Sequence, residues 1–512
     1  MRDVQCLERS GWRVAVRVGL TVCVIGAASA PASAEWAVRL VAPETGAFQI
    51  NQGAVTSMRV LPVFGGGGVD VAYADPRTRS AYRHRFTEDV VSPESVMLPL
   101  ANSLHVVPVV DDFGGFSFAS VGNQFPDTAV TVGNQIGPDL TDPASYHTYN
   151  IAFGSENPSP EIQGPLVGSW PFSYELDRQG LPVIASWTAE AQIQSNVRYL
   201  WHYNPQTDRW DRRVPPQLGP QNQFPPFNTL APQGVGFLPD NRVVFANTSD
   251  NLLSVHLEDP VLGWREIAFQ EDLWSRSGVS LAVSDAGEVA FAFSDDTLGG
   301  LTVGIYDGQQ TVYENVSGAS QALLGQHSLA YDPEGNLALV YSEPDQEDEL
   351  VLARRSGPGA WNATPLGVYG NFGFYGELAF GDDGEIYVGA VVGSGTLFNT
   401  PYLALISNRI APLRGDMNFD DTVDLDDVLA FITALEDPAL YWEGYGLDPV
   451  LKGDLNGDGL FNFSDVEPFV AELGLTDPAA QGLLNLVPEP TTAGLLAAGW
   501  AGLLVRGRRR RG

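Results

Sequence analysis

The segment LAYDPEGNLALVYSE, residues 329–343, places two apolar runs around the turn Asp332-Pro333-Glu334-Gly335. Apolar residues that alternate with a period of two indicate β-strands, and a glycine at the turn is typical of a tight hairpin. The pattern recurs as GFLPDNRVVFANTSD from residue 236, LAVSDAGEVAFAFSD from 281 and LAFGDDGEIYVGAV from 378, with weaker copies from residues 61, 109 and 174. A repeated β-hairpin therefore organises the chain between residues 35 and 410.

The spacing of these hairpins predicts the architecture. Several hairpins are followed by a strand, a turn and a tryptophan, so Trp210, Trp264 and Trp361 are expected to mark the turn between a third and a fourth strand. Four strands in about 45 to 50 residues are typical of a propeller blade. The hairpin turns lie 47, 65, 61, 46, 48 and 49 residues apart, at Gly68, Gly115, Gly180, Asn241, Gly287, Gly335 and Gly384.

We therefore predict an all-β fold for residues 35–410: a β-propeller, with seven blades as the first choice and six or eight as alternatives. The longer intervals around residues 120–170 predict a loop insertion or a divergent blade. A pair of β-sandwiches is the competing architecture, because the first three repeats are faint.

A second repeated phrase follows the hairpins. GDMNFDDTVDLDDVLAFITAL, residues 415–435, returns 38 residues later as GDLNGDGLFNFSDVEPFVAEL, residues 453–473. Ca²⁺ takes six to eight oxygen ligands, and a twelve-residue loop supplies them from positions 1, 3, 5, 7, 9 and 12. The predicted calcium ligands are Asp416, Asn418, Asp420, the Thr422 carbonyl, Asp424 and Asp427 in the first loop, and Asp454, Asn456, Asp458, the Leu460 carbonyl, Asn462 and Asp465 in the second.

The two loops differ at position 6, where the turn favours glycine. The second loop has Gly459 there, whereas the first has Asp421, which adopts a left-handed conformation at some cost. The alternative interpretation of both loops is a pair of solvated acidic turns. Each loop continues into apolar residues at helical spacing, so two helices are expected to pack against each other. Those residues are Val428, Leu429, Ile432 and Leu435 after the first loop, and Val466, Phe469, Val470 and Leu473 after the second.

Residues 411–476 resemble a type I dockerin module, a duplicated calcium loop and helix with Asp at position 12 of each loop. The resemblance implies a small α-helical, EF-hand-like module that binds Ca²⁺ and a cohesin domain. It also implies a secreted protein held on a scaffold, often a polysaccharide-degrading enzyme. The family recognises its partner through hydroxyl residues at positions 10 and 11. This chain departs from that pattern with Leu425-Asp426 and Phe463-Ser464.

Both ends of the chain carry targeting patterns. Residues 1–34 combine four arginines, the apolar run VGLTVCVIGAASA and a small-residue cleavage site, which is the pattern of a secretory signal peptide. Near the other end, Pro488-Glu489-Pro490 precedes an apolar stretch and five arginines, which favours a short membrane anchor over a terminal helix packed on the body. Residues 477–512 are similar to a PEP-CTERM sorting signal. That similarity implies transient membrane insertion, processing by an exosortase, and a place at the cell surface or in the extracellular matrix.

Composition excludes several classes of function. Acidic residues outnumber basic ones 62 to 28, and a formal charge of −34 repels the phosphates of nucleic acids and anionic lipid surfaces. Both cysteines, Cys6 and Cys23, lie in the predicted signal peptide, so the mature chain is expected to have no disulfide and no thiol nucleophile. Lys452 is the single lysine, which excludes Schiff-base and P-loop chemistry based on an earlier lysine.

The sequence contains no catalytic motif. SDAGEVAF, residues 284–291, approaches a sialidase aspartate box, but its spacing does not match, so Asp285 and Asp332 are expected to cap hairpin turns. The six histidines have no metal-ligand spacing. Glycoside hydrolysis needs only two carboxylates, and the sequence singles out no pair among its many acidic residues.

Two functional hypotheses follow. The first is an exported, non-catalytic binding or scaffold protein whose propeller recognises a glycan or a protein. The alternative is a carbohydrate-active enzyme, a glycoside hydrolase of polysaccharide catabolism, with its site on the propeller face. Carboxylates and aromatic side chains that converge at one mouth of the propeller would favour the enzyme.

Overall fold

The computed structural model describes most of the chain between residues 36 and 474. The described ranges are 36–42, 58–63, 68–75, 80–87, 94–97, 103–110, 116–122, 129–135, 144, 146–152, 173–190, 195–216, 234–249, 252–271, 279–295, 300–316, 327–343, 349–369, 377–392, 402–409, 413–420 and 422–474. The predicted signal peptide and the predicted sorting tail lie outside them. Over the described residues, no helix has both the length and the apolar character needed to cross a membrane.

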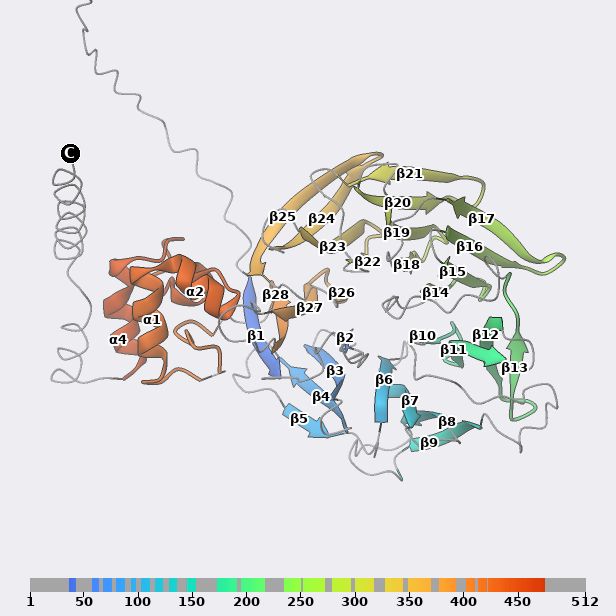
Figure 1. Ribbon diagram of the computed structural model, residues 1–512, viewed down its shortest axis with the longest axis horizontal. Helices are drawn as coiled ribbons and strands as arrows, with labels where there is room; N and C mark the ends of the chain where they lie inside the picture. The colour runs from blue at the N-terminus through green and yellow to red at the C-terminus, as the bar shows by residue number, and fades with distance from the viewer. Residues whose placement is uncertain are drawn as a thin grey trace, which may run out of the picture. The chain divides into compact units, whose positions relative to one another are not determined.

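Twenty-eight described strands form seven antiparallel sheets of four strands each (Figure 1). Blade 1 contains β2 (Met58–Pro62), β3 (Val69–Asp75), β4 (Ser80–Phe86) and β5 (Glu94–Met97). Blade 2 contains β6 (Ser103–Val110), β7 (Phe116–Gly122), β8 (Ala129–Gln135) and β9 (Tyr146–Ala152). Blade 3 contains β10 (Ser173–Leu176), β11 (Pro182–Glu190), β12 (Ser195–Asn204) and β13 (Arg209–Arg213).

The remaining blades follow in chain order. Blade 4 contains β14 (Gly234–Phe237), β15 (Val243–Ser249), β16 (Leu252–Asp259) and β17 (Gly263–Gln270). Blade 5 contains β18 (Ser280–Val283), β19 (Val289–Asp295), β20 (Gly300–Tyr306) and β21 (Thr311–Asn315). Blade 6 contains β22 (His327–Tyr331), β23 (Leu337–Glu343), β24 (Glu349–Gly357) and β25 (Ala360–Tyr369). Blade 7 contains β26 (Glu377–Phe380), β27 (Ile386–Val392), β28 (Tyr402–Ser407) and β1 (Ala37–Ala42).

The blades close into a ring through their first strands. β2 contacts β6, β6 contacts β10, and the series continues through β14, β18, β22 and β26 back to β2. These seven strands lie on the inside of the ring and the later strands of each blade lie outside them (Figure 1). The prediction of an all-β propeller is confirmed, and the seven sheets agree with the first of the three predicted blade numbers.

The two ends of the propeller sequence meet in blade 7. β1 pairs antiparallel with β28, with Ala37 opposite Ser407 and Leu40 opposite Ala404. The earliest strand therefore completes the sheet formed by the last three. This pairing supplies the fourth strand of blade 7 and covers the edge of β28.

The predicted hairpin turns are present where the structure describes them. Gly180, Gly287, Gly335 and Gly384 have φ between 74° and 85°, and Asn241 takes φ 68° at the matching position. A left-handed conformation favours glycine and is tolerated by asparagine, which explains the residues chosen there. The turn prediction is confirmed at these five positions.

The two aspartates expected to cap hairpin turns behave differently. Asp332 does so, since its Oδ1 accepts the backbone N–H of Asn336 at 2.7 Å. Asp285 does not, so that prediction is wrong. Ser284 Oγ accepts the N–H of Glu288 at 3.0 Å, and the Asp285 carboxylate points outward to Arg178. The hydroxyl one residue earlier reaches the backbone and leaves Asp285 exposed.

The tryptophan prediction is confirmed. Trp210, Trp264 and Trp361 each occupy the second position of a fourth strand, in β13, β17 and β25. Trp361 also links two blades, because its indole Nε1 donates to Glu314 Oε2 of blade 5 at 3.2 Å. Arg355 donates to the same carboxylate at 2.7 Å.

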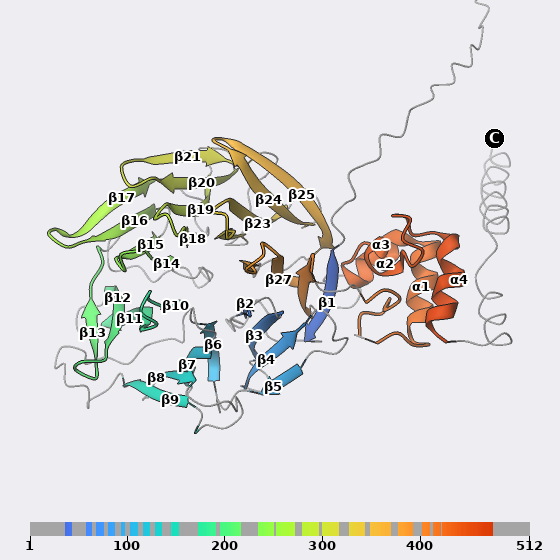
Figure 2. The same ribbon diagram turned by 180° about the vertical axis from the view of Figure 1, so that it is seen from behind.

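The C-terminal part is helical. Its elements are α1 (Asp427–Glu436), α2 (Pro438–Tyr445), α3 (Pro449–Gly453), the short 3-10 helix η5 (Phe463–Asp465) and α4 (Val466–Glu472). α1 and α4 lie side by side in both views (Figures 1 and 2), and the rings of Phe431 and Phe469 stack between them with centroids 4.1 Å apart. The two predicted helices and their mutual packing are confirmed. Leu429, expected on the buried face, is 75% exposed, and Ala430, Phe431 and Ala434 are buried instead.

One apolar cluster joins this helical part to the propeller. It contains Val368 and Val388 from blades 6 and 7 together with Phe431, Leu447 and Phe469. The backbone N–H of Asp448 donates to the Gly367 carbonyl at 3.0 Å, and Leu447 forms a bridge with Val368. The helices are therefore packed onto the propeller through a continuous core.

Gly304 of β20 shows how closely the core of blade 5 is packed. Phe291 lies directly opposite Gly304 in the sheet and is fully buried, with its ring stacked on Phe293. A Cβ at position 304 would overlap the ring of Phe291. The absence of a side chain at this position lets the aromatic ring cross the strand.

We expect Gly304→Ala to lower the free energy of unfolding by about 1–3 kcal/mol, because the added methyl forces Phe291 out of its site. Urea unfolding followed by fluorescence measures the change. Gly357→Ala is the matched control, since a Cβ there meets no atom within 4 Å. Equal stability of the two variants would contradict this account of the packing.

Candidate functional site

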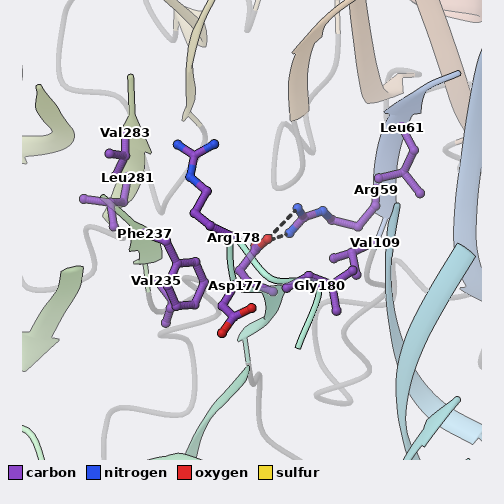
Figure 3. Close-up of a pocket in the computed structure, with 13 residues that line it drawn as sticks. Arg59, Leu61, Val109, Asp177, Arg178, Gly180, Val235, Phe237, Leu281 and Val283 are labelled. Atoms are coloured by element: carbon purple, nitrogen blue, oxygen red, sulfur yellow. Dashed lines mark hydrogen bonds and ion pairs between the residues drawn. The ribbon is translucent and has the colours of Figure 1, made fainter. Parts of the chain in front are cut away.

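A pocket of about 320 Å³ opens among the inner strands of five blades (Figure 3). Its apolar wall comes from the first strands of blades 1, 2, 4 and 5, and its charged wall comes from blade 1 and from the end of β10 in blade 3. The lining residues are Arg59, Leu61, Val109, Glu175, Leu176, Asp177, Arg178, Gly180, Val235, Gly236, Phe237, Leu281 and Val283. The ring of blades thus brings together side chains that lie more than 200 residues apart in the sequence.

Arg59 is the centre of the charged wall. Its Nη1 lies 2.9 Å from Glu175 Oε1, and its Nε lies 2.8 Å from Glu377 Oε1. Glu377 also accepts the backbone N–H of Val60 through Oε2 at 2.7 Å. These contacts tie blade 1 to blade 3 on one side and to blade 7 on the other. Each of the three side chains is about a quarter exposed, so all three are partly open to solvent.

The two glutamates have different surroundings. Burial raises the pKa of Glu377 to about 7, and the charge of Arg59 acts in the opposite direction. Burial lowers the pKa of Arg59, but the charges of Glu175 and Glu377 raise it further, so the net pKa lies above the usual value. Arg59 therefore stays a cation, while the carboxyl group of Glu377 loses its proton at a higher pH than an exposed glutamate does.

Asp177 lines the pocket and holds the turn that follows β10. It follows β10, and its Oδ1 accepts the backbone N–H groups of Gln179 and Leu181 at 2.8 and 2.9 Å. Its Oδ2 lies 2.8 Å from His202 Nε2 and 3.1 Å from the Asn241 amide nitrogen. Burial raises the pKa of Asp177, but these hydrogen bonds outweigh burial and hold it below the usual value. Asp177 is thus an ionised anchor for the turn.

Arg178 adds a second cation to the pocket. The Asn241 side chain accepts the backbone N–H of Arg178 at 2.9 Å, which links the turns of blades 3 and 4. The Arg178 guanidinium lies beside the apolar wall (Figure 3), and its Nη1 lies 3.3 Å from Asp285 Oδ1. The Asp285 side chain is 93% exposed, so this ion pair is at the surface and contributes little to stability.

Of the residues that line the pocket, only Gly180 stands out in the sequence, as a hairpin turn. The signal that was available is a charged residue inside a first strand: Arg59 in MRVLP, Glu175 in SYEL and Glu377 in ELAF. First strands of a propeller face the ring interior, where an unpaired charge is costly. A charged residue at such a position therefore requires a partner from another blade. Which residue is the partner depends on how the ring closes.

The first acidic loop has the framework expected of a cation-binding loop. Asp427 at position 12 accepts the N–H of Asn418 through Oδ1 and of Asp424 through Oδ2, both at 2.8 Å. Asp420 Oδ1 accepts the Thr422 N–H at 3.0 Å. Asp416 at position 1 is fully buried and lies 3.0 Å from Lys452 Nζ.

The second acidic loop repeats this framework. Asp465 at position 12 accepts the N–H groups of Asn456 and Asn462 at 3.1 and 2.9 Å. Asp454 at position 1 accepts the N–H groups of Asp458 and Gly459, and Gly459 has the positive φ of 80° expected at position 6. Asp458 in turn accepts the Leu460 N–H at 2.9 Å.

The structure therefore places each set of six predicted ligand residues in one compact loop. Among the residues that it describes, no three His, Cys, Asp or Glu side chains lie close enough together to hold a metal ion by themselves. The carboxylates at positions 1 and 12 bind backbone N–H groups of their own loop. Any cation site here also draws on asparagine and carbonyl oxygens.

Comparison with known proteins gives only remote similarity. No known protein family matches the sequence, and no curated protein resembles it in sequence. Solved structures that are similar include an α-L-arabinofuranosidase from Fusarium graminearum, with a TM-score of 0.38 and 9% identity over 60% of this chain and 93% of that chain. Aleuria aurantia lectin, a six-bladed propeller that recognises fucose, has a TM-score of 0.38 and 9% identity over 60% and 94%. The polysaccharide lyase Uly1 has a TM-score of 0.40 and 8% identity over 69% and 90%. Because the identities and TM-scores are low, the fold is assigned from the strand order and the blade contacts of this chain itself.

We expect Arg59→Gln to lower the free energy of unfolding by about 1–3 kcal/mol, because it leaves Glu175 and Glu377 without their cation in a partly buried site. A double-mutant cycle with Glu175→Gln, measured by urea unfolding, isolates the interaction free energy between Arg59 and Glu175. Arg242→Gln is the control, since its pair with Asp240 is exposed and little change is expected. Strict additivity of Arg59→Gln and Glu175→Gln would show that the ion pair contributes nothing.

Proposed function

We propose that the propeller is a carbohydrate-active domain and that it cleaves a glycosidic bond where Arg59 and Glu175 line the pocket on its inner strands and Glu377 pairs with Arg59. The supporting observation is the pair of glutamates, Glu175 and Glu377, that two different blades bring to Arg59. Glycoside hydrolysis uses two carboxyl groups whose surroundings give them different protonation states. The apolar wall of the pocket, with Phe237 in it, offers a surface for the face of a sugar ring.

The surroundings of the two glutamates suggest separate roles. Burial raises the pKa of Glu377 to about 7, so this group holds its proton below about pH 7 and is suited there to protonate the leaving oxygen. Glu175 is the second carboxyl group and acts on water or on the sugar carbon. Arg59 positions both groups. Arg178 lies across the pocket and is suited to bind sugar hydroxyl or carboxylate oxygens.

A second candidate function is glycan binding without cleavage, by an exported surface protein. One observation favours it: Arg59 already engages both glutamates, and an ion pair of this kind also closes a ring of blades without taking part in chemistry. The two functions differ in what they require of Glu377. Cleavage needs its proton, whereas binding alone does not.

The test is release of reducing ends from a panel of plant, algal and fungal polysaccharides. We expect cleavage by the wild type, and a loss of kcat of about 10²- to 10⁴-fold in Glu377→Gln and Glu175→Gln. Activity is expected to fall as the pH rises above about 7, because Glu377 loses its proton there. Glu334→Gln, at an exposed turn position, is the matched control. Glycan binding in calorimetry without any cleavage would favour the second function.

We also propose that the helical part is a calcium-dependent interaction module, as its dockerin-like repeats suggest, and that export and PEP-CTERM-type sorting place the protein at the cell surface. The second loop fits the ion: it offers carboxylate oxygens of Asp454, Asp458 and Asp465, the side chain of Asn456 and the carbonyl of Leu460. Bound Ca²⁺ supplies folding free energy to the loop. A cohesin-like protein is the proposed partner of the module, and an exosortase that of the tail.

We expect Ca²⁺ to raise the melting temperature of the full chain and a chelator to lower it again. Asp465→Ala removes the position 12 carboxylate, so this response is expected to disappear. Calorimetric unfolding with and without Ca²⁺ measures both effects. Asp437→Ala, which removes only the cap of α2, is the control and keeps the response. An unchanged calcium response in Asp465→Ala would contradict the loop assignment.

A further inference from the structure

The two acidic loops share a framework, but their first aspartates have different partners. Asp416 of the first loop lies 3.0 Å from Lys452 Nζ through Oδ2, and its Oδ1 accepts the N–H of Asp420. Asp454 of the second loop accepts only backbone N–H groups through its carboxylate, those of Gly457, Asp458 and Gly459. A side-chain cation therefore pairs with the position 1 carboxylate in one loop and not in the other.

The Lys452–Asp416 pair is inaccessible to solvent. The exposed fractions of the two side chains are 1% and 0%. The ammonium also lies 4.6 Å from the centroid of the Phe419 ring, within the range of a cation–π contact. A buried lysine with a carboxylate on one side and an aromatic ring on the other is held firmly, because leaving this site would strand Asp416 as an unpaired buried charge.

Position 4 of the loops shows the same divergence. Gly457 of the second loop has φ 76°, which glycine adopts without strain. Phe419 stands at the matching position of the first loop with φ 60°, a conformation that is unfavourable for an aromatic residue. Its ring belongs to the main apolar cluster and faces Lys452. The first loop thus has an unfavourable backbone conformation at Phe419, the residue whose ring contacts Lys452.

The repeat has a second basic residue for comparison. Arg414 lies 38 residues before Lys452, at the matching position of the first copy. Its Nη1 donates to the backbone carbonyl of Asp454 at 2.5 Å, so it also crosses to the other loop. The crossing is reciprocal, but Arg414 reaches a carbonyl oxygen whereas Lys452 reaches a carboxylate oxygen.

We propose that the helical part binds one Ca²⁺ ion, in the second loop, and that the Lys452 ammonium takes the place of a metal ion in the first loop. This inference rests on the proposed calcium function of the second loop. A calcium ion in the first loop would have to share Asp416 with an ammonium group that cannot move away, and the two cations would repel each other strongly at this depth. The donor set of the first loop matches that of the second, but its central carboxylate is already neutralised.

The proposal gives the two halves different dependence on calcium. In the first loop the Lys452 ammonium neutralises Asp416. The loop that leads into α1 is therefore expected to stay folded in the absence of metal. In the second loop Arg414 donates to the Asp454 carbonyl, and the described donors to the Asp454 carboxylate are backbone N–H groups, so this loop is expected to depend on the ion. Depletion of calcium is therefore expected to loosen the second loop and α4 while the first loop stays folded.

Calorimetric titration of Ca²⁺ into the full, metal-stripped chain tests the proposal. One ion per chain is expected. The matched variants are Asp420→Asn and Asp458→Asn, which change the same exposed position 5 in each loop. Asp458→Asn is expected to weaken calcium binding at least tenfold, and Asp420→Asn to leave it unchanged. Equal effects of the two variants, or two ions per wild-type chain, would overturn the inference and leave the calcium function intact.

Removal of the lysine is the second arm. Lys452→Met keeps the length of the side chain and removes its charge, so the stoichiometry is expected to rise from one ion to two. Arg414→Met, at the matching position, is expected to stay at one. A stoichiometry of one in Lys452→Met would overturn the proposed substitution of ammonium for metal, provided that circular dichroism shows the wild-type helix content. If Lys452→Met does not fold, the position 5 variants decide. No binding by the wild type would instead reject the calcium function itself, and the inference with it.

Discussion

Pairing of β1 with β28 holds the two ends of the propeller sequence in one sheet. Without β1 the last blade would have three strands, and the outer N–H and C=O groups of β28 would lack partners. Here the strand at residues 37–42 completes the sheet formed by residues 377–407. The pairing spans almost the whole propeller sequence, so its loop-closure entropy is large. The contact between β2 and β26 follows from it.

The pocket depends on that closure. Arg59 and Glu377 come from blades 1 and 7, the two blades that the closure makes neighbours, and Glu175 reaches the same guanidinium from blade 3. Three charged side chains on inner strands would be costly if each faced the interior alone. Here the single cation of Arg59 pairs with both carboxyl groups, and all three side chains remain partly exposed, which is an arrangement that a binding or catalytic site can use. The same contacts that hold the ring thus bring two carboxyl groups to one arginine at the pocket.

The helical part shows how duplicated sequence becomes inequivalent in three dimensions. Both loops have a carboxylate at position 12 that accepts backbone N–H groups of its own loop. Asp427 and Asp465 make matching contacts of this kind. They differ where the copies face each other: Lys452 neutralises Asp416, and Arg414 binds a carbonyl of the other loop. The rings of Phe431 and Phe469, which belong to the two copies, stack on each other between α1 and α4. Core packing preserves the repeat, while the charged residues near the loops differentiate it.

Several features follow from residues that are neighbours in the chain. Strand periodicity, the glycine or asparagine at hairpin turns such as Gly335 and Asn241, the tryptophans of the fourth strands and the two acidic loops with their helices were all predictable, because each is a local pattern with its own geometry. The burial of Leu429 was predicted wrongly, since helical spacing defines a face but not which neighbour covers it. Asp285 was also misjudged, because the adjacent Ser284 reaches the same backbone group.

The charged residues that meet from distant parts of the chain could not be predicted in this way. Arg59, Glu175 and Glu377 are separated by more than 100 residues each, and Lys452 is 36 residues from Asp416. No periodicity connects such positions, and a chain with 62 acidic residues offers too many possible pairs. Ring closure and helix packing select the pairs, because a charge that is removed from water requires a partner at that place.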